Sequence, residues 1–362
     1  MQWVVNNVTN AEVEKKNANY SQIRTLNIPR RMELSPKDTI STTWLVCSPE
    51  TVGRFSGVAY FFARKVYEET NIPIGIINSS WGGTIVETWT SLEAANTLPQ
   101  KRLDRYNKNE KLSPPTEYFT RTKKEAKRND YPSLVYNAMI HPLLSFAIKG
   151  VVWYQGENNV GNAEPYTDWL TCMISDWRNR WNSELPFYII QLPNFDSTNK
   201  TPLWAEIRDA QRKVLTVPKT HLIVTSDLGD PHDLHPRNKQ EVGMRVALQV
   251  LHHEYGRPDI VSESPMFERM EINGDTIIIT FKNTGSGLEI RSRYGCLQGF
   301  AIAGEDKKFY WAQGELKDNR IVIWNPKVPN PIAVRYNWEN NPDGNLYNKD
   351  GLPACLFRTD NW

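Results

Sequence analysis

Along the first two thirds of the chain, short apolar runs alternate with stretches in which apolar residues recur every three or four positions. Such runs predict buried strands, and the recurring positions predict amphipathic helices. The predicted strands cover residues 73–78, 148–155, 186–192 and 220–227. The predicted helices cover residues 56–70, 163–182, 204–215 and 237–254. Buried strands separated by helices are typical of a parallel sheet covered on both faces, so we predict a doubly wound α/β domain.

Beyond about residue 262 the apolar spacing changes to two, which predicts antiparallel strands joined by Gly, Asn and Asp turns. These strands cover residues 274–282, 296–304, 308–313, 320–326 and 332–338. We therefore predict two domains, an α/β domain over 1–262 and a small β domain over 263–362. Within the first, residues 98–131 carry many charges, predominantly basic, and we interpret them as a polar surface excursion.

Composition narrows the possible functions. The chain has 362 residues, enough for two domains, and 40% of them are hydrophobic, which excludes a disordered protein. The net charge is only +2, so we expect no nucleic-acid partner. The most apolar stretch, 134–153, is interrupted by polar residues and predicts no membrane span. The first sixteen residues show no signal peptide, and the thirteen Trp and fifteen Tyr suit sugar ligands as well as cores.

The four cysteines have no paired spacing, so neither a zinc ribbon nor a dense disulfide framework is indicated. Two alternatives remain for Cys296 and Cys355. They form one bridge, or they are two inert buried thiols.

Ligands of doubly wound sheets bind beyond the carboxyl ends of the strands, and two polar segments are predicted there. Residues 78–84 contain Gly82 and Gly83, which let the backbone approach a ligand and present N–H groups to an oxyanion. Residues 154–159 place a glycine among amide side chains, which can direct NH₂ donors to one point. Ordinary strand-to-helix turns would also explain both segments.

A third segment, 230–236, follows the strand predicted at 220–227. Asp233 and His235 are two apart, so in an extended loop the carboxylate can orient the imidazole. Pro236 fits the first helical position, which would place His235 at a helix N-terminus and keep its ring neutral and basic. A metal site formed by His232, His235 and nearby acids is the alternative. No third ligand cluster supports it, so we expect no metal.

These segments resemble the conserved blocks of SGNH-type hydrolases, and of the sialate O-acetylesterase family in particular. The resemblance covers residues 47–91, 134–159, 231–247 and 345–362. It implies an SGNH or flavodoxin-like parallel sheet. It also implies that His235 is the general base and that Asp233 orients it. In the common pattern the acid stands three residues before the histidine, but that position is His232 here, so Asp230 remains the alternative to Asp233.

The same resemblance implies an oxyanion hole formed by the N–H of Gly83, next to Gly82, and by the side chain of Gln155 or Asn158. Glu157 would anchor its loop, and Trp81 would line a sugar pocket. No cofactor is implied.

The implied reaction releases acetate from O-acetylated sialic acids by a Ser-His-Asp mechanism, in a periplasmic or extracellular setting. Three alternatives remain: an esterase of acetylated polysaccharides such as acetylxylan, a catalytically inactive carbohydrate-binding module, and a metal-dependent hydrolase.

In this family the nucleophile lies in a Gly-Gln-Ser-Asn-Met segment after the first parallel strand. Met1-Gln2-Trp3 resembles the end of that segment, so we expect the serine two residues before Met1, outside the chain. Ser80 lies near the glycines, but nothing marks it as a replacement. The first strand of the sheet would then be missing too, which leaves unpaired backbone groups and exposes apolar faces. We expect either an unstable chain or a gap in the middle of its sheet.

Overall fold

The computed structural model describes residues 2–108, 110–112, 131–196 and 201–362. Most of the predicted polar excursion, residues 109 and 113–130, lies outside the described residues. Contacts between Cα atoms divide the chain into two compact units. The first unit comprises Met1–Ile190, Ala210–His221 and Arg237–Ala247, and the second comprises Gln191–Asp209, Leu222–Pro236 and Leu248–Trp362. The predicted boundary between residues 262 and 263 stays a prediction.

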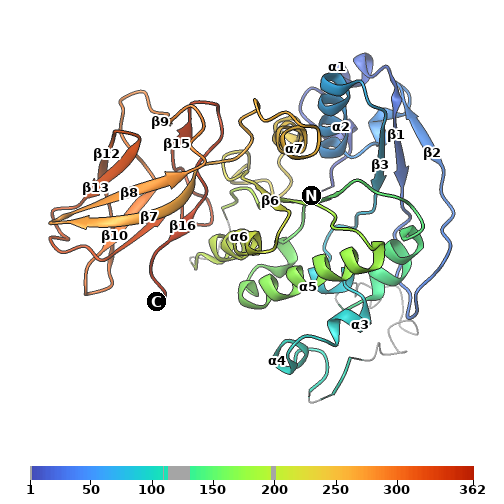
Figure 1. The fold of residues 1–362 in the computed structure, drawn as a ribbon, viewed down its shortest axis with the longest axis horizontal. Helices are drawn as coiled ribbons and strands as arrows, with labels where there is room; N and C mark the ends of the chain where they lie inside the picture. The colour runs from blue at the N-terminus through green and yellow to red at the C-terminus, as the bar shows by residue number, and fades with distance from the viewer. Residues whose placement is uncertain (1, 109, 113–130, 197–200) are drawn as a thin grey trace. The chain divides into compact units, whose positions relative to one another are not determined.

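The four predicted helices are confirmed, with ends within two residues of the predicted ones. The helices are α1 (Ala11–Asn17), α2 (Gly57–Thr70), α3 (Leu92–Ala95), α4 (Gln100–Leu103), α5 (Ala163–Trp181), α6 (Leu203–Lys213) and α7 (Lys239–Glu254) (Figure 1). The sequence places Val58, Phe62 and Val66 on one face of α2; Val58 and Val66 are buried there and Phe62 is half-buried. None of the helices in the described ranges has the length and apolar character needed to cross a bilayer.

The α/β part contains parallel strands, as predicted, but they belong to two sheets. The strands are β1 (Tyr20–Asn27), β2 (Trp44–Cys47), β3 (Ile74–Asn78), β4 (Val151–Trp153), β5 (Phe187–Ile190) and β6 (Thr220–Ile223). One sheet has the order β2-β1-β3 and the other β4-β5-β6. β1 pairs in parallel with β3 and β4 with β5, whereas β2 is antiparallel to β1. β1 was not predicted, because polar residues interrupt its apolar positions, and β2 was not predicted because its apolar run is only four residues long.

Among the described residues, β3 and β4 are therefore edge strands, each with one neighbour within its sheet. Ile76 is the one buried residue of β3, and Val152 of β4 is 38% exposed. The interior strands of a covered parallel sheet are normally buried on both faces. These two strands thus combine an apolar sequence with incomplete burial.

The C-terminal third forms antiparallel sheets, which confirms the prediction from the two-residue spacing. Its strands are β7 (Met266–Asn273), β8 (Thr276–Lys282), β9 (Leu288–Ile290), β10 (Phe300–Ala303), β11 (Phe309–Trp311), β12 (Gln313–Lys317), β13 (Arg320–Trp324), β14 (Ala333–Tyr336), β15 (Leu346–Asn348) and β16 (Phe357–Arg358). Two four-stranded sheets, β11-β10-β14-β16 and β12-β13-β8-β7, contribute alternate residues to one core. Ile277, Ile279 and Phe281 of β8 point into it.

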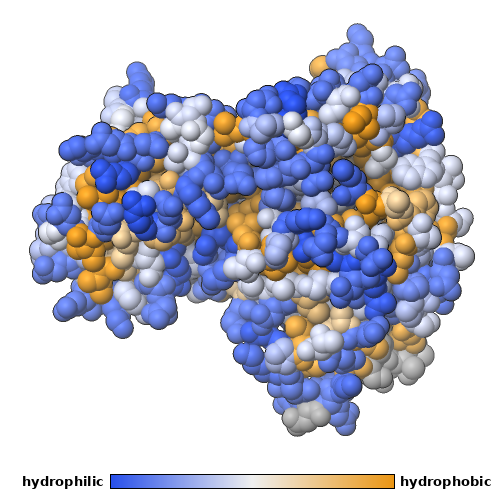
Figure 2. Space-filling model, in the orientation of Figure 1, coloured by the Kyte–Doolittle hydropathy of each residue, from blue (hydrophilic) through white to orange (hydrophobic). Residues whose placement is uncertain are grey.

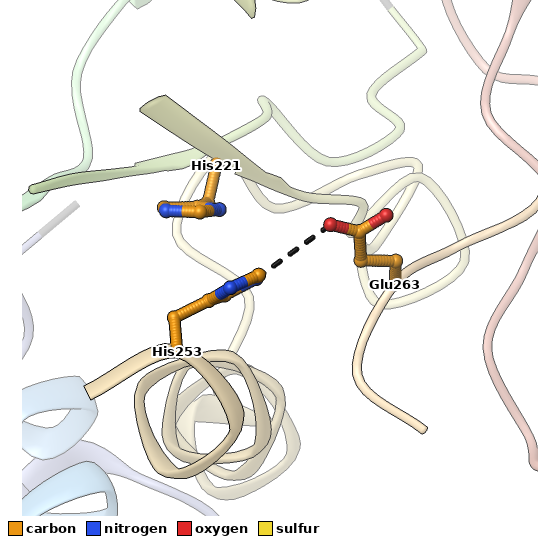
Figure 3. Close-up of side chains that lie close together, drawn as sticks. All are labelled: His221, His253 and Glu263. Carbon is orange, nitrogen blue, oxygen red and sulfur yellow. Dashed lines mark ion pairs between the residues drawn. The ribbon is translucent and has the colours of Figure 1, made fainter. Parts of the chain in front are cut away.

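All four cysteines are free, so the possible Cys296–Cys355 bridge does not form. The interpretation as two buried thiols is confirmed for Cys355 and is wrong for Cys296, which lies exposed in the irregular segment before β10. Near the end of α7, His253 lies 3.6 Å from the carboxylate of Glu263, an ion pair when the ring is protonated (Figure 3). The surface seen in Figure 2 is mostly hydrophilic, with apolar residues in small groups.

Candidate active site

The loop that follows β3 exposes two glycines. Gly83 has φ of +77°, in the left-handed region that favours glycine, and a Cβ at Gly82 or Gly83 would meet no atom within 4 Å. The hydroxyl of Thr84 donates to the carbonyl of Trp81 at 2.8 Å and closes the turn. The loop therefore leaves backbone open to an approaching ligand, and Trp81 beside it is partly exposed.

The loop that follows β4 is hydrogen-bonded to this glycine turn. The amide nitrogen of Gln155 donates to the carbonyl of Thr84 at 2.9 Å and to Oδ1 of Asn159 at 2.8 Å. Both amide hydrogens of Gln155 are thus used inside the protein. Asn158 is exposed, and its amide donates to the carbonyl of Gly83 at 2.9 Å. Of the two amides considered for the oxyanion hole, that of Asn158 lies at the surface.

The buried side chain of Asn159 forms hydrogen bonds with residues of both loops. Its Oδ1 accepts the N–H of Val86 at 3.0 Å, and its Nδ2 donates to the carboxyl of Glu87 at 2.9 Å. Glu87 is only 2% exposed, and burial raises the pKa of its carboxyl. Asn159 is 1% exposed, so every one of these bonds is made away from water.

Two further side chains fix the backbone at Gln155. The hydroxyl of Tyr166 donates to its carbonyl at 3.1 Å, and the amide of Gln211 donates to the same oxygen at 3.0 Å. No signal in the sequence marks Tyr166 or Gln211 for this role, or Glu87 for its bond to Asn159. Tyr166 follows Gln155 by eleven residues and Gln211 by fifty-six, and no local motif links them.

Glu157 also acts within the loop. Its carboxylate accepts the N–H of Gly156 at 3.1 Å. Ser80, the alternative nucleophile, donates its hydroxyl to Asn78 at 2.9 Å, and Asn78 in turn donates to Asn27 at 2.9 Å. In this arrangement Ser80 takes part in the hydrogen bonding at the strand ends.

The acid–histidine segment belongs to the second unit and contains two successive Asx turns. The carboxylate of Asp230 accepts the N–H of His232, and that of Asp233 accepts the N–H of His235, both at 2.8 Å. The carbonyl of Pro231 accepts the N–H of Asp196 at 3.0 Å and so holds the segment from outside. Asp233 and His235 are half-buried, whereas Asp230 and His232 are exposed to solvent.

The expectation that Pro236 begins the following helix is wrong. α7 begins at Lys239, three residues later. The side chain of Asn238 accepts the N–H of Glu241 at 3.2 Å and caps the helix there. His235 is therefore not at a helix N-terminus, and the expected effect of the helix dipole on its ring does not apply.

Comparisons with known proteins agree with this combination of segments. A family profile described as "Carbohydrate esterase, sialic acid-specific acetylesterase" matches residues 14–252. The sialate O-acetylesterase of Homo sapiens is 30% identical over 304 residues, which cover 75% of this chain and 55% of the human protein. That of Mus musculus is 27% identical over 388 residues, covering 94% of this chain and 71% of the mouse protein. The chain thus spans about half the length of the human relative.

A solved structure is also similar. The crystal structure of a carbohydrate acetylesterase from Xanthomonas citri superposes with a TM-score of 0.89 and 35% sequence identity. The similarity covers 100% of this chain and 78% of the bacterial one.

Proposed function

This chain belongs to the sialic acid-specific acetylesterase family of carbohydrate esterases, and from that premise we propose that it hydrolyses acetyl esters of carbohydrates, with O-acetylated sialic acids as substrates. The observation that carries the proposal is the hydrogen-bonded pair of loops after β3 and β4, which exposes Gly83 and Asn158 side by side. An exposed backbone turn beside an amide donor is what an oxyanion requires.

The reaction follows a Ser-His-Asp mechanism. His235 removes the proton of a serine hydroxyl as its oxygen attacks the acetyl carbonyl, and the negative charge moves to the carbonyl oxygen. The intermediate collapses to an acetyl-enzyme as His235 returns the proton to the departing sugar oxygen. Water, deprotonated by His235, then attacks the acetyl carbon. The ester bond to the serine breaks as His235 returns the proton to the serine oxygen, and acetate leaves. Asp233 supports this role because its carboxylate already fixes the backbone of His235 at 2.8 Å.

Asn158 supplies the side-chain donor of the oxyanion hole. Both amide hydrogens of Gln155 are donated to Thr84 and Asn159, so its side chain holds the loop after β4 in place. Asn158 uses one amide hydrogen for Gly83 and is exposed, which leaves the other hydrogen to a substrate oxygen. The N–H of Gly83 completes the pair.

The serine is contributed by a strand that precedes Met1 and pairs with the open edges of β3 and β4. Two observations support this. β3 and β4 are apolar edge strands in separate sheets, although the loops that follow them are hydrogen-bonded to each other. A single inserted strand would satisfy both edges and carry its C-terminal residues to those loops.

The test compares acetate release from O-acetylated sialic acid by the 362-residue chain and by a chain extended upstream in the same reading frame. The extended chain is expected to be active, and His235→Ala should lower its kcat by about 10⁶-fold. His232→Ala removes a ring from the same loop and should leave kcat unchanged. Equal activity of both chains, abolished by Ser80→Ala, would overturn the proposed serine. A higher kcat/KM on acetylated xylan would overturn the substrate.

A further inference from the structure

The acid–histidine segment, 230–236, and the glycine before it are supported by the loop that follows β5. The side-chain oxygen of Asn194 accepts the N–H of Gly229 at 2.7 Å, and the N–H of Asp196 donates to the carbonyl of Pro231 at 3.0 Å. Both bonds lie within the second unit. The Asx turns inside the segment fix its local shape, so these two bonds determine where that shape is placed.

Gly229 packs directly against Asn194. A Cβ at this glycine would overlap both the carbonyl oxygen and the side-chain oxygen of Asn194. Glycine allows such a close approach between two backbones. A movement of Asn194 therefore displaces the start of the acid–histidine segment.

Asn194 is itself held by the C-terminal part of the chain. Its side-chain nitrogen donates to the side-chain oxygen of Asn341 at 2.7 Å, and the N–H of the next residue, Phe195, donates to the carbonyl of Asn340 at 3.2 Å. An asparagine amide has one oxygen that accepts and one nitrogen that donates. Because the N–H of Gly229 requires the oxygen, the nitrogen is directed to Asn341, and one side chain links the two segments.

The segment 339–341 is fixed from its other side by α6. The buried guanidinium of Arg208 donates to the carbonyls of Glu339 and Asn340, to the latter at 3.3 Å. The side-chain oxygen of Asn340 also accepts the N–H of Trp204 at 2.9 Å. A buried guanidinium that loses its acceptors is costly, so these bonds are retained. The segment therefore offers Asn194 a fixed point of attachment.

We propose that Asn194 is a positioning residue of the esterase, which transfers the fixed position of Asn341 to the acid–histidine segment and so sets the position of His235. The inference rests on the proposed function of His235. A general base that is displaced by about 1 Å loses about 10²-fold in rate. The segment 339–341 thus contributes to catalysis through the backbone of residues 230–236.

Hydrogen exchange on the complete 362-residue chain tests this support directly, by mass spectrometry of peptides that cover residues 228–236. Asn194→Ala removes the acceptor for Gly229 and the donor to Asn341, so exchange in these peptides should become about tenfold faster. Asn341→Ala should accelerate it less, because the acceptor for Gly229 remains. Asn325→Ala is the matched control and should change nothing. Asn325 is also half-buried, and its side chain also makes one donor and one acceptor bond at 2.7 Å, to residues outside this segment.

The kinetics of the extended chain test the catalytic role, with kcat expressed per folded chain as determined by circular dichroism. Asn194→Ala should lower kcat by about 10²-fold and change KM by less than about twofold. The double variant Asn194→Ala/Asn341→Ala should lose no more than Asn194→Ala alone, because both changes act through one bond. Asn194→Asp keeps an acceptor for Gly229, and the amide of Asn341 can turn to donate to it, so this variant should recover most of the lost kcat.

Each of the other outcomes would overturn a distinct part of the proposal. Unchanged exchange in Asn194→Ala would overturn the support of the segment, whatever the activity of the chain. Faster exchange with full kcat, or an equal loss of kcat in Asn325→Ala, would overturn the catalytic role. Normal exchange and kcat in Asn341→Ala would overturn the contribution of the C-terminal segment. An extended chain that releases no acetate would overturn the proposed function and the catalytic role together, whereas the exchange rates decide the support of the segment separately.

Discussion

Replacement of Asn159 by alanine should destabilise the protein far more than the same change at its neighbour, Asn158. The side chain of Asn159 satisfies three partners at once: the N–H of Val86, one amide hydrogen of Gln155 and the carboxyl of Glu87. The Asn159→Ala change leaves all three without that partner in a site that is 1% exposed. Each buried group left unsatisfied costs about 1–3 kcal/mol.

The sum is an upper limit, because the loop can relax and admit water. We therefore expect the free energy of unfolding to fall by about 3–5 kcal/mol, a large part of a typical stability of about 5–15 kcal/mol. Urea unfolding followed by circular dichroism measures this loss. Asn158→Ala removes a single bond from an exposed side chain and should cost less than about 1 kcal/mol, while it lowers kcat of the extended chain. Equal losses of stability for the two variants would refute the assignment of Asn159 as the buried connection between the loops.

Three further predictions follow from buried and exposed groups. Burial raises the pKa of the Glu87 carboxyl above its ordinary value of 4.5, so the folded state keeps this proton to a higher pH than the unfolded state does, and this contribution to stability should fall as pH rises from 4.5. Glu87→Gln should reduce this fall in urea titrations at increasing pH, and identical pH slopes would contradict it. Asp176→Ala should cost about 2–4 kcal/mol, measured by the same titrations, because the buried carboxylate accepts two bonds from Ser91 at 2.8 Å. A thiol reagent at pH 8 should modify the exposed Cys296 rapidly and the buried Cys47 only on unfolding, because burial raises the pKa of Cys47 to about 11; rapid labelling of Cys47, located by mass spectrometry of peptides, would disprove this.

The sequence predicts a helix or strand correctly where one face of that element is apolar and buried, because the apolar residues then recur at a regular spacing. The helix α5 was predicted to within one residue at its C-terminal end, because its apolar residues recur at helical spacing over nineteen positions. β8 was found for the same reason at a spacing of two. β1 was missed because only three of its eight residues are buried and polar residues separate them. Its partner β3, which would have defined it, is distant in sequence.

In the candidate site, too, the features that depend on local residues were predicted and those that depend on distant residues were not. The glycine turn and the amide loop were identified because glycine and amide residues are themselves the signal. The separate roles of Gln155 and Asn158 were not, because they depend on the carbonyl of Thr84, 71 residues earlier in the chain. The start of α7 was misplaced although Asn238 and Glu241 form a recognisable capping pair. Pro236 suits a first helical turn, but the side chain of Asn238 determines where the helix begins.

The edges of β3 and β4 that have no neighbouring strand in the described part of the chain have a practical consequence for its handling. Unpaired strand edges are templates for other strands, and the exposed Val152 lies on one of them. Preparations of this chain should therefore associate as their concentration rises. A short synthetic peptide that adds a strand to these edges would compete with that association. Light scattering with and without such a peptide would thus report on the pairing capacity of the sheets, and a peptide that carries the serine would complement the chain in trans.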